Sequence, residues 1–181
     1  MRITDMTDTL FDREMQRILS DVQFWAIRLG NIGDFTLTPT PASYADGEGQ
    51  QPFPLALDIK EVWDYARGEG SCPREILEII QSLCELLWCP VAAHTYEVPN
   101  AFWDMPLGFM CQLAHARLAL DSGESLSVEQ LAMLGDLKPA RVRQLCQSGD
   151  ITAFKKERTD NSQQEWRISA NAAKEWLASR E

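Results

Sequence analysis

Arginine, lysine and glutamine side chains gather over residues 138–158, and these residue types contact duplex DNA. A short helix is expected over Pro139–Ser148, with Val142, Leu145 and Cys146 on its apolar side. On the opposite side, Arg would bond guanine and Gln would bond adenine through paired hydrogen bonds in the major groove. Lysines on a following hairpin would meet phosphate groups. The candidate DNA-binding residues are Lys138, Arg141, Arg143, Gln144, Gln147, Lys155, Lys156 and Arg158.

The elements around this helix have recognisable start and stop signals. A first helix carries Val128, Leu131, Ala132 and Leu134 at helical spacing, and Gly135 is expected to end it by adopting a positive φ. Pro139 suits the first turn of the second helix, where its missing N–H costs nothing. Short strands are expected over 151–156 and 165–168, joined by a loop at 159–164 and followed by a helix after residue 169. The helices position the candidate residues, and the hairpin adds a basic edge.

This segment resembles the MerR/excisionase-type winged helix-turn-helix superfamily over about the last 55 residues. The matching residues are Gly135, Pro139, Ala140, Val142, Ser148, Gly149, Ile151, Trp166, Arg167, Ile168, Trp176 and Leu177. The resemblance implies a DNA-binding fold whose second helix enters the groove. Two departures concern the start of that helix. Lys138 stands where the family has a Ser or Thr cap, and Asp136 and Leu137 make the turn one residue longer.

Composition indicates a folded protein of the cytoplasm. The chain has 181 residues, 45% of them hydrophobic, and six tryptophans, which argues against disorder. No apolar run approaches the ~18 residues that a membrane span needs. The N-terminus lacks the apolar core of a signal peptide. Five scattered cysteines are typical of reduced, mostly buried thiols. We therefore expect no membrane association and a cytoplasmic location.

Charge divides the chain in two. Residues 1–125 carry eight basic and nineteen acidic side chains, a net charge of −11, whereas residues 126–181 carry nine and eight, a net charge of +1. The change coincides with a Ser/Gly-containing linker at 121–125. We expect an acidic helical domain over 1–121, serving dimerisation, sensing or partner binding, and a winged helix-turn-helix domain over 126–181. Because the second domain is nearly neutral, a monomer would bind DNA weakly.

The front part is mainly helical and is expected to form a small bundle. Its first helix, over 10–29, would be capped by Asp8 or Thr9. A Pro/Thr/Gly-rich loop follows over 35–53, and residues 91–98 form a short strand or a connector. Further helices are expected over 59–67, from Pro73 to Leu87, and over 106–120 with Asp104 as cap. The fold class is therefore mainly α, with one β-hairpin in the C-terminal domain.

The front part contains atoms that bind metals, but not at the spacing of a metal site. The metal-capable residues are Cys84, Cys89, His94, Cys111 and His115. No close C-x-x-C pair is present, so core thiols and imidazoles are expected and no metal or cofactor. The carboxylates Glu75, Glu78 and Glu85 have the spacing of one solvated helix face. Trp88, Phe102, Trp103 and Phe109 are expected in the core. The sequence contains no nucleophile-elbow motif and no phosphate-binding loop, so we do not expect an enzyme.

Two classes of function stay open. The first is a DNA-binding protein, as a transcriptional regulator or an accessory factor in recombination, acting on double-stranded DNA as a homodimer. The second is an acidic protein-interaction module, for example an inhibitor, adaptor or DNA mimic, that uses its front domain on a protein partner. Trp166, Trp176 and Leu177 are expected to clamp the hairpin to the helices, and Arg167 reaches phosphate or packs on its own strand.

Overall fold

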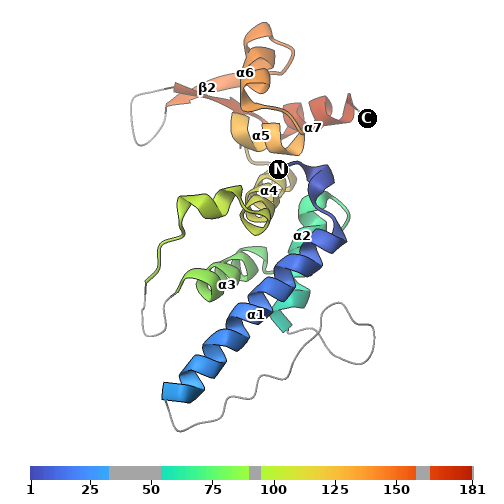
Figure 1. Cartoon of the computed structure of the whole chain (residues 1–181). Helices are drawn as coiled ribbons and strands as arrows, with labels where there is room; N and C mark the ends of the chain where they lie inside the picture. Colours follow the sequence, from blue (N-terminus) through green and yellow to red (C-terminus); the bar gives the residue numbers. More distant parts are fainter. Residues whose placement is uncertain (33–53, 90–94, 158–163, 181) are drawn as a thin grey trace. The chain divides into compact units, whose positions relative to one another are not determined.

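The chain is mainly α-helical and carries one small antiparallel sheet, in agreement with the expected fold class (Figure 1). The structure is a computed structural model that describes residues 1–32, 54–89, 95–157 and 164–180. It contains two compact units, one formed by Asp5–Leu107 and the other by Met1–Thr4 with Gly108–Glu181. The units meet at residues 107 and 108, so most of the helix that ends at Asp121 belongs to the second unit. The expected functional division into 1–121 and 126–181 stays a prediction.

Helix α1, Asp8–Ile32, follows a short 3-10 turn, η1, over Ile3–Asp5. Its cap is Thr7, whose Oγ1 accepts a hydrogen bond from the Leu10 backbone N–H at 3.1 Å. The expectation of a cap at Asp8 or Thr9 was wrong. Asp8 is the first helical residue, and its carboxylate instead bonds two cations of the next helix. A carboxylate in the first turn also interacts favourably with the helix dipole.

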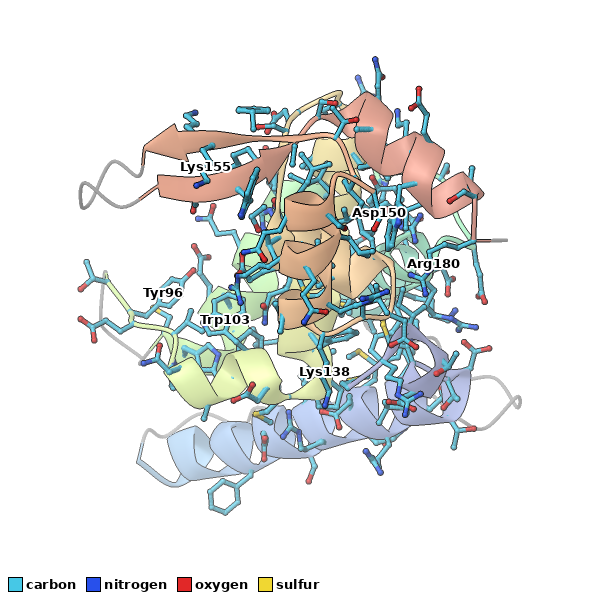
Figure 2. All side chains as sticks on the ribbon, turned by 90° about the horizontal axis from the view of Figure 1, so that it is seen from above. Tyr96, Trp103, Lys138, Asp150, Lys155 and Arg180 are labelled. Carbon is cyan, nitrogen blue, oxygen red and sulfur yellow. The ribbon has the colours of Figure 1, made fainter. Side chains whose placement is uncertain are left out.

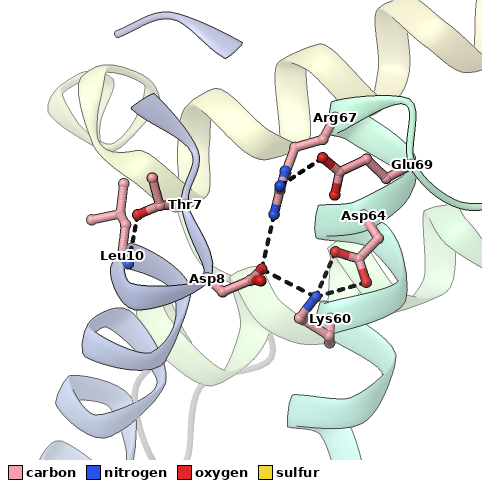
Figure 3. Close-up of polar contacts among 7 residues, drawn as sticks. All are labelled: Thr7, Asp8, Leu10, Lys60, Asp64, Arg67 and Glu69. Carbon is pink, nitrogen blue, oxygen red and sulfur yellow. Dashed lines mark hydrogen bonds and ion pairs between the residues drawn. The ribbon is translucent and has the colours of Figure 1, made fainter. Parts of the chain in front are cut away.

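Helix α2, Pro54–Arg67, packs against α1 through an aromatic contact. The rings of Phe11 and Trp63 are both buried, with their centroids 5.4 Å apart. The same two helices are also joined by ion pairs: the Asp8 carboxylate accepts a hydrogen bond from Arg67 at 2.8 Å and lies 3.4 Å from the Lys60 ammonium (Figure 3). Arg67 also bonds Glu69 at 2.6 Å. The apolar contact supplies most of the stabilisation, because ion pairs at the surface contribute little each.

The ion pairs shift the ionisation of both partners. The nearby Lys60 ammonium, followed by Arg67, holds the pKa of the Asp8 carboxyl below its ordinary value of 3.8. Partial burial would lower the pKa of Lys60, but its bonds to Asp64 and Asp8 outweigh burial and raise the pKa above 10.5. Both side chains are therefore charged over the whole range from weakly acidic to weakly alkaline pH.

Helix α3, Ile76–Trp88, begins three residues after the expected start at Pro73, because residues 74–75 form a turn. The 3-10 helix η2, Asn100–Asp104, follows. Rings from these elements stack edge to face: Trp88 to Phe102 at 5.7 Å and Phe102 to Trp103 at 5.2 Å. Phe102 is buried, so the expectation of core packing is confirmed for this ring, whereas Trp88 and Trp103 are only half-buried. Residues 95–98 form neither helix nor strand, while 91–94 and the expected loop at 35–53 lie outside the described residues.

Helix α4 spans Pro106–Asp121. Met105 directly precedes it, so Asp104 closes η2 and is not its cap. Leu107, Met110 and Leu113 are fully buried. Across the described residues, no helix is both long enough and apolar enough to cross a bilayer.

The C-terminal elements alternate helices with a three-stranded sheet. In chain order they are β1 Leu126–Ser127, α5 Val128–Leu134, α6 Pro139–Ser148, β2 Ala153–Glu157, β3 Gln164–Ile168 and α7 Ala170–Ala178. The sheet order is β1-β3-β2, all antiparallel. Strand β1 was not predicted, because two residues are too short to show alternation. Ser127 ends β1 and caps α5 through a reciprocal pair of hydrogen bonds with Gln130.

Candidate nucleic-acid interface

Helix α6 begins and ends where the sequence predicts. Pro139 occupies the first turn, and Lys138 precedes it without a side-chain cap, as expected. Gly149 takes the left-handed conformation, with φ 84°, and ends the helix. The Ile151 N–H then donates to the Leu145 carbonyl at 3.2 Å. These local interactions fix a ten-residue helix whose first turn contains no acidic side chain.

The apolar side of α6 anchors it on α5. Val142 is fully buried and Cys146 is nearly so, whereas Leu145 is half-buried. The facing side of α5 buries Val128, Leu131, Ala132 and Leu134, as its spacing predicted. Burial raises the pKa of the Cys146 thiol, so this sulfur stays protonated and acts as an apolar side chain.

The opposite side of α6 presents polar side chains to solvent. Lys138, Arg141, Gln144 and Gln147 are all exposed, as predicted. A guanidinium nitrogen of Arg141 lies 3.4 Å from the Gln144 amide oxygen, so these two side chains are neighbours on the helix surface. That contact is at the limit of a hydrogen bond and leaves both groups available to a ligand.

Arg143 occupies the flank of α6 that faces α5. Its guanidinium bonds the Glu129 carboxylate at 2.5 Å, and both side chains remain about half exposed, 49% and 56%. The sequence did not reveal this pair, because its members are fourteen residues apart on different helices. Arg143 is therefore held by an internal partner, unlike the other cation of α6.

Lys155 and Lys156 lie on β2, which pairs with β3 from Ala153 to Glu157. Because successive side chains of a strand point to opposite faces, these two lysines cannot contact the same line of phosphates. Lys155 lies on the Trp166 side, with its ammonium 5.3 Å from the ring centroid (Figure 2). Arg158 falls outside the described residues.

The other face of the hairpin carries a residue that sequence reasoning missed. Phe154 is 48% exposed there and pairs across the strands with Arg167, while Lys156 pairs with Glu165. Arg167 bonds Glu165 at 2.5 Å, so it packs along its own strand. Successive side chains of a strand point to opposite faces, so a strand over 153–157 places Phe154 and Lys156 on one face. That spacing was the signal that could have identified this mixed aromatic and basic face.

The turn before α6 is fixed by the last helix, α7. Gly135 has φ −93°, and Asp136 is the residue with a positive φ, 50°, so the expectation about Gly135 was wrong. Gly135 is required by space: a Cβ there would lie 2.8 Å from the Trp176 ring. Arg180 donates to the Gly135 carbonyl and stacks on Trp176, with its guanidinium carbon 4.8 Å from the ring centroid. Half-buried Trp176 thus contacts the turn between α5 and α6, whereas its expected role of clamping the hairpin, together with Trp166 and Leu177, stays a prediction.

The cysteines and histidines of residues 1–121 form no cluster that could hold a metal ion among the residues that the structure describes. Cys84 is buried in α3, and burial raises the pKa of its thiol. Cys111 is also buried and is not in a disulfide among the described residues, and His94 lies outside them. The carboxylates Glu75, Glu78 and Glu85 are exposed, as expected of a solvated face.

These features give a helix with an exposed, cation-bearing side, a sterically fixed turn before that helix, and a hairpin with a lysine on each face. No family model, no curated protein and no solved structure matches this chain.

Proposed function

We propose that this protein binds double-stranded DNA through α6 and the β2–β3 hairpin, as a cytoplasmic transcriptional regulator or an accessory DNA-binding factor. The observation that carries the proposal is the exposed side of α6, formed by Arg141, Gln144 and Gln147, with exposed Lys138 directly before the helix. The helix is anchored by its buried side, so this exposed side is presented by a fixed element. An α-helix fits the major groove, and these side chains match its donors and acceptors.

The order of elements supports the winged-helix part of the proposal. Two helices joined by a short turn are followed by a hairpin and a final helix, which is the order expected from the resemblance. Strands β2 and β3 form the hairpin, and they pair with each other beyond the two residues of β3 that pair with β1. Lys155 and Lys156 lie on this hairpin. In this arrangement the hairpin would contact the backbone while α6 contacts the bases.

Local charge also favours this side of the unit. Glu129 and Glu165 are neutralised by ion pairs with Arg143 and Arg167. The N-terminus of α6 adds the positive end of its dipole to the charge of Lys138. Lys138, Arg141 and the N-terminus of α6 therefore supply the positive charge that would attract DNA in a domain that is nearly neutral as a whole. Affinity would still be modest for one copy, so we propose a homodimer that contacts two half-sites.

Fluorescence anisotropy with labelled duplexes tests the proposal. A preferred site is first selected from a random duplex pool with the full chain, and the affinity is then measured against salt concentration. We expect Arg141→Ala to lose about 1–3 kcal/mol of binding free energy on that site and much less on random duplex. Lys155→Ala should weaken both duplexes alike and reduce the salt slope by about one.

The matched control is Lys174→Ala, which removes the same charge from an exposed position on α7. It should bind like the unchanged protein. Equal losses of affinity from Arg141→Ala and Lys174→Ala would mean that the protein binds DNA only through nonspecific electrostatic attraction. Absence of salt-dependent binding to any duplex would remove the DNA-binding proposal.

A second candidate function is favoured by the acidic unit, Asp5–Leu107. Three of its described cations bond acids of the same unit: Arg17 bonds Glu14, Lys60 bonds Asp64 and Arg67 bonds Asp8. Many of its carboxylates remain exposed. The exposed acids of helices α2 and α3 include Asp58, Glu61, Glu78 and Glu85. This charge suits a basic protein partner or DNA mimicry, and titration with a lysine-rich peptide tests it. Peptide binding in a chain that binds no duplex would favour this function over the first.

A further inference from the structure

The outermost side chains of α6 are not its arginines. In an α-helix each residue advances by about 100°, so Gln144 lies about 200° from the buried Val142. Ala140 and Gln147 lie on either side of Gln144 at intervals of four and three residues, and all three are exposed. We call Ala140, Gln144 and Gln147 the outer stripe of α6. Arg141 and Arg143 flank it on opposite sides.

The flanking groups are less suited to the floor of a groove. Arg143 is held by Glu129 at 2.5 Å, toward α5. Ser148, at the C-terminal end, uses its hydroxyl within the chain. It donates to the Gln144 carbonyl at 3.0 Å and lies 2.6 Å from the Asp150 carboxylate.

The two ends of α6 differ in charge. Lys138 and the positive end of the helix dipole lie at the N-terminus, while Asp150 and the negative end lie at the C-terminus (Figure 2). A polyanion therefore favours the N-terminal and central part of the helix. That part contains Ala140 and Gln144, with Gln147 one turn later.

We propose that the outer stripe of α6 reads A·T base pairs in the major groove, an inference that rests on the proposed DNA binding. A Gln carboxamide can donate to adenine N7 and accept from adenine N6, forming a paired hydrogen bond. The methyl group of Ala140 suits contact with the C5-methyl of thymine. The ligand is thus duplex DNA whose half-site places adenines against Gln144 and Gln147 and a thymine against Ala140. Arg141 lies at the edge of the stripe, where it reaches a flanking guanine.

Modified bases test each contact in the full chain. Sites selected from a random duplex pool are resynthesised with 7-deazaadenine, which lacks N7, or with uracil, which lacks the thymine methyl. We expect 7-deazaadenine at the position read by Gln144 to weaken binding by roughly 5- to 150-fold. Gln144→Ala should weaken the unmodified site similarly and be insensitive to that base change. Uracil opposite Ala140 should cost about three- to fivefold.

A gain-of-specificity variant guards against loss of folding. Glu accepts from cytosine N4, so Gln144→Glu should change the preferred base at one position from adenine to cytosine. The matched change Gln112→Glu, on α4, should leave the selected sequence unchanged. Selection of G·C-rich sites, or insensitivity to both modified bases, overturns A·T readout while leaving DNA binding in place. No binding to any duplex removes the proposed function itself.

Discussion

Gly135→Ala separates a steric requirement from a conformational one. At φ −93° alanine is allowed, and such a change alone would stabilise the protein by about 0.4–1 kcal/mol. The new Cβ would instead lie 2.8 and 3.0 Å from two atoms of the Trp176 ring and 2.9 Å from the Arg180 guanidinium. Arg180 can move, but the half-buried ring must shift. Overpacking of this kind costs about 1–3 kcal/mol. We expect a net loss of about 1–2 kcal/mol in the free energy of unfolding.

The assay is urea unfolding followed by circular dichroism. In a Trp176→Leu background, which removes the ring, Gly135→Ala should become neutral or stabilising, with a coupling energy of about 1–3 kcal/mol. The control is Gly123→Ala, because Gly123 has φ +78° and open space around it. Its cost is conformational and should persist in the Trp176→Leu background. Equal costs for Gly135→Ala with and without the Trp176 ring would refute the steric reasoning.

Three further outcomes are expected. Glu129→Gln should raise DNA affinity about two- to fivefold, because it frees Arg143 and removes a negative charge; Glu175→Gln on α7 is the control, and equal effects would contradict the role of the pair. Asp8→Asn should cost about 0.2–1 kcal/mol at neutral pH in urea unfolding. Because the pKa of Asp8 is lowered on folding, its stabilisation is present above the unfolded pKa near 3.8 and is lost as pH falls through the lower folded pKa. The difference between Asp8→Asn and the unchanged protein should therefore vanish at strongly acidic pH, and a constant difference would argue against the ion pair. Light scattering should give twice the 20.5 kDa chain mass at high concentration, and a strict monomer would count against the proposed homodimer.

Local signals account for much of what the sequence predicted in the C-terminal unit. Helix α6 has a Pro start, a Gly stop and an apolar pair at 142 and 146, so its bounds were predicted without error. The N-terminal helices were predicted less well. Helix α2 begins at Pro54, five residues before the expected start, and buried Ala56 continues the helical spacing of Ile59 toward the first turn. The cap of α1 moved to Thr7 because the Asp8 carboxylate is drawn to Lys60, more than fifty residues away.

The candidate site shows the same division. Exposure of Arg141 and Gln144 follows from their helical spacing relative to Val142, which the sequence contains. The opposite faces of Lys155 and Lys156 follow from strand alternation, once the hairpin register is known. The engagement of Arg143 by Glu129 depends on how α5 packs against α6.

The sequence by itself determined where α6 begins and ends, which sides of α5 and α6 are apolar, and which polar side chains of α6 are exposed. Those properties depend on neighbours within a turn or two of the chain. Only the tertiary structure decided that Leu126 adds a strand beside Ile168, and that Gly135 lies against Trp176 and Arg180. These contacts join residues more than forty positions apart. They are set by the packing of side-chain volumes and the pairing of backbone groups in space, which no local pattern records.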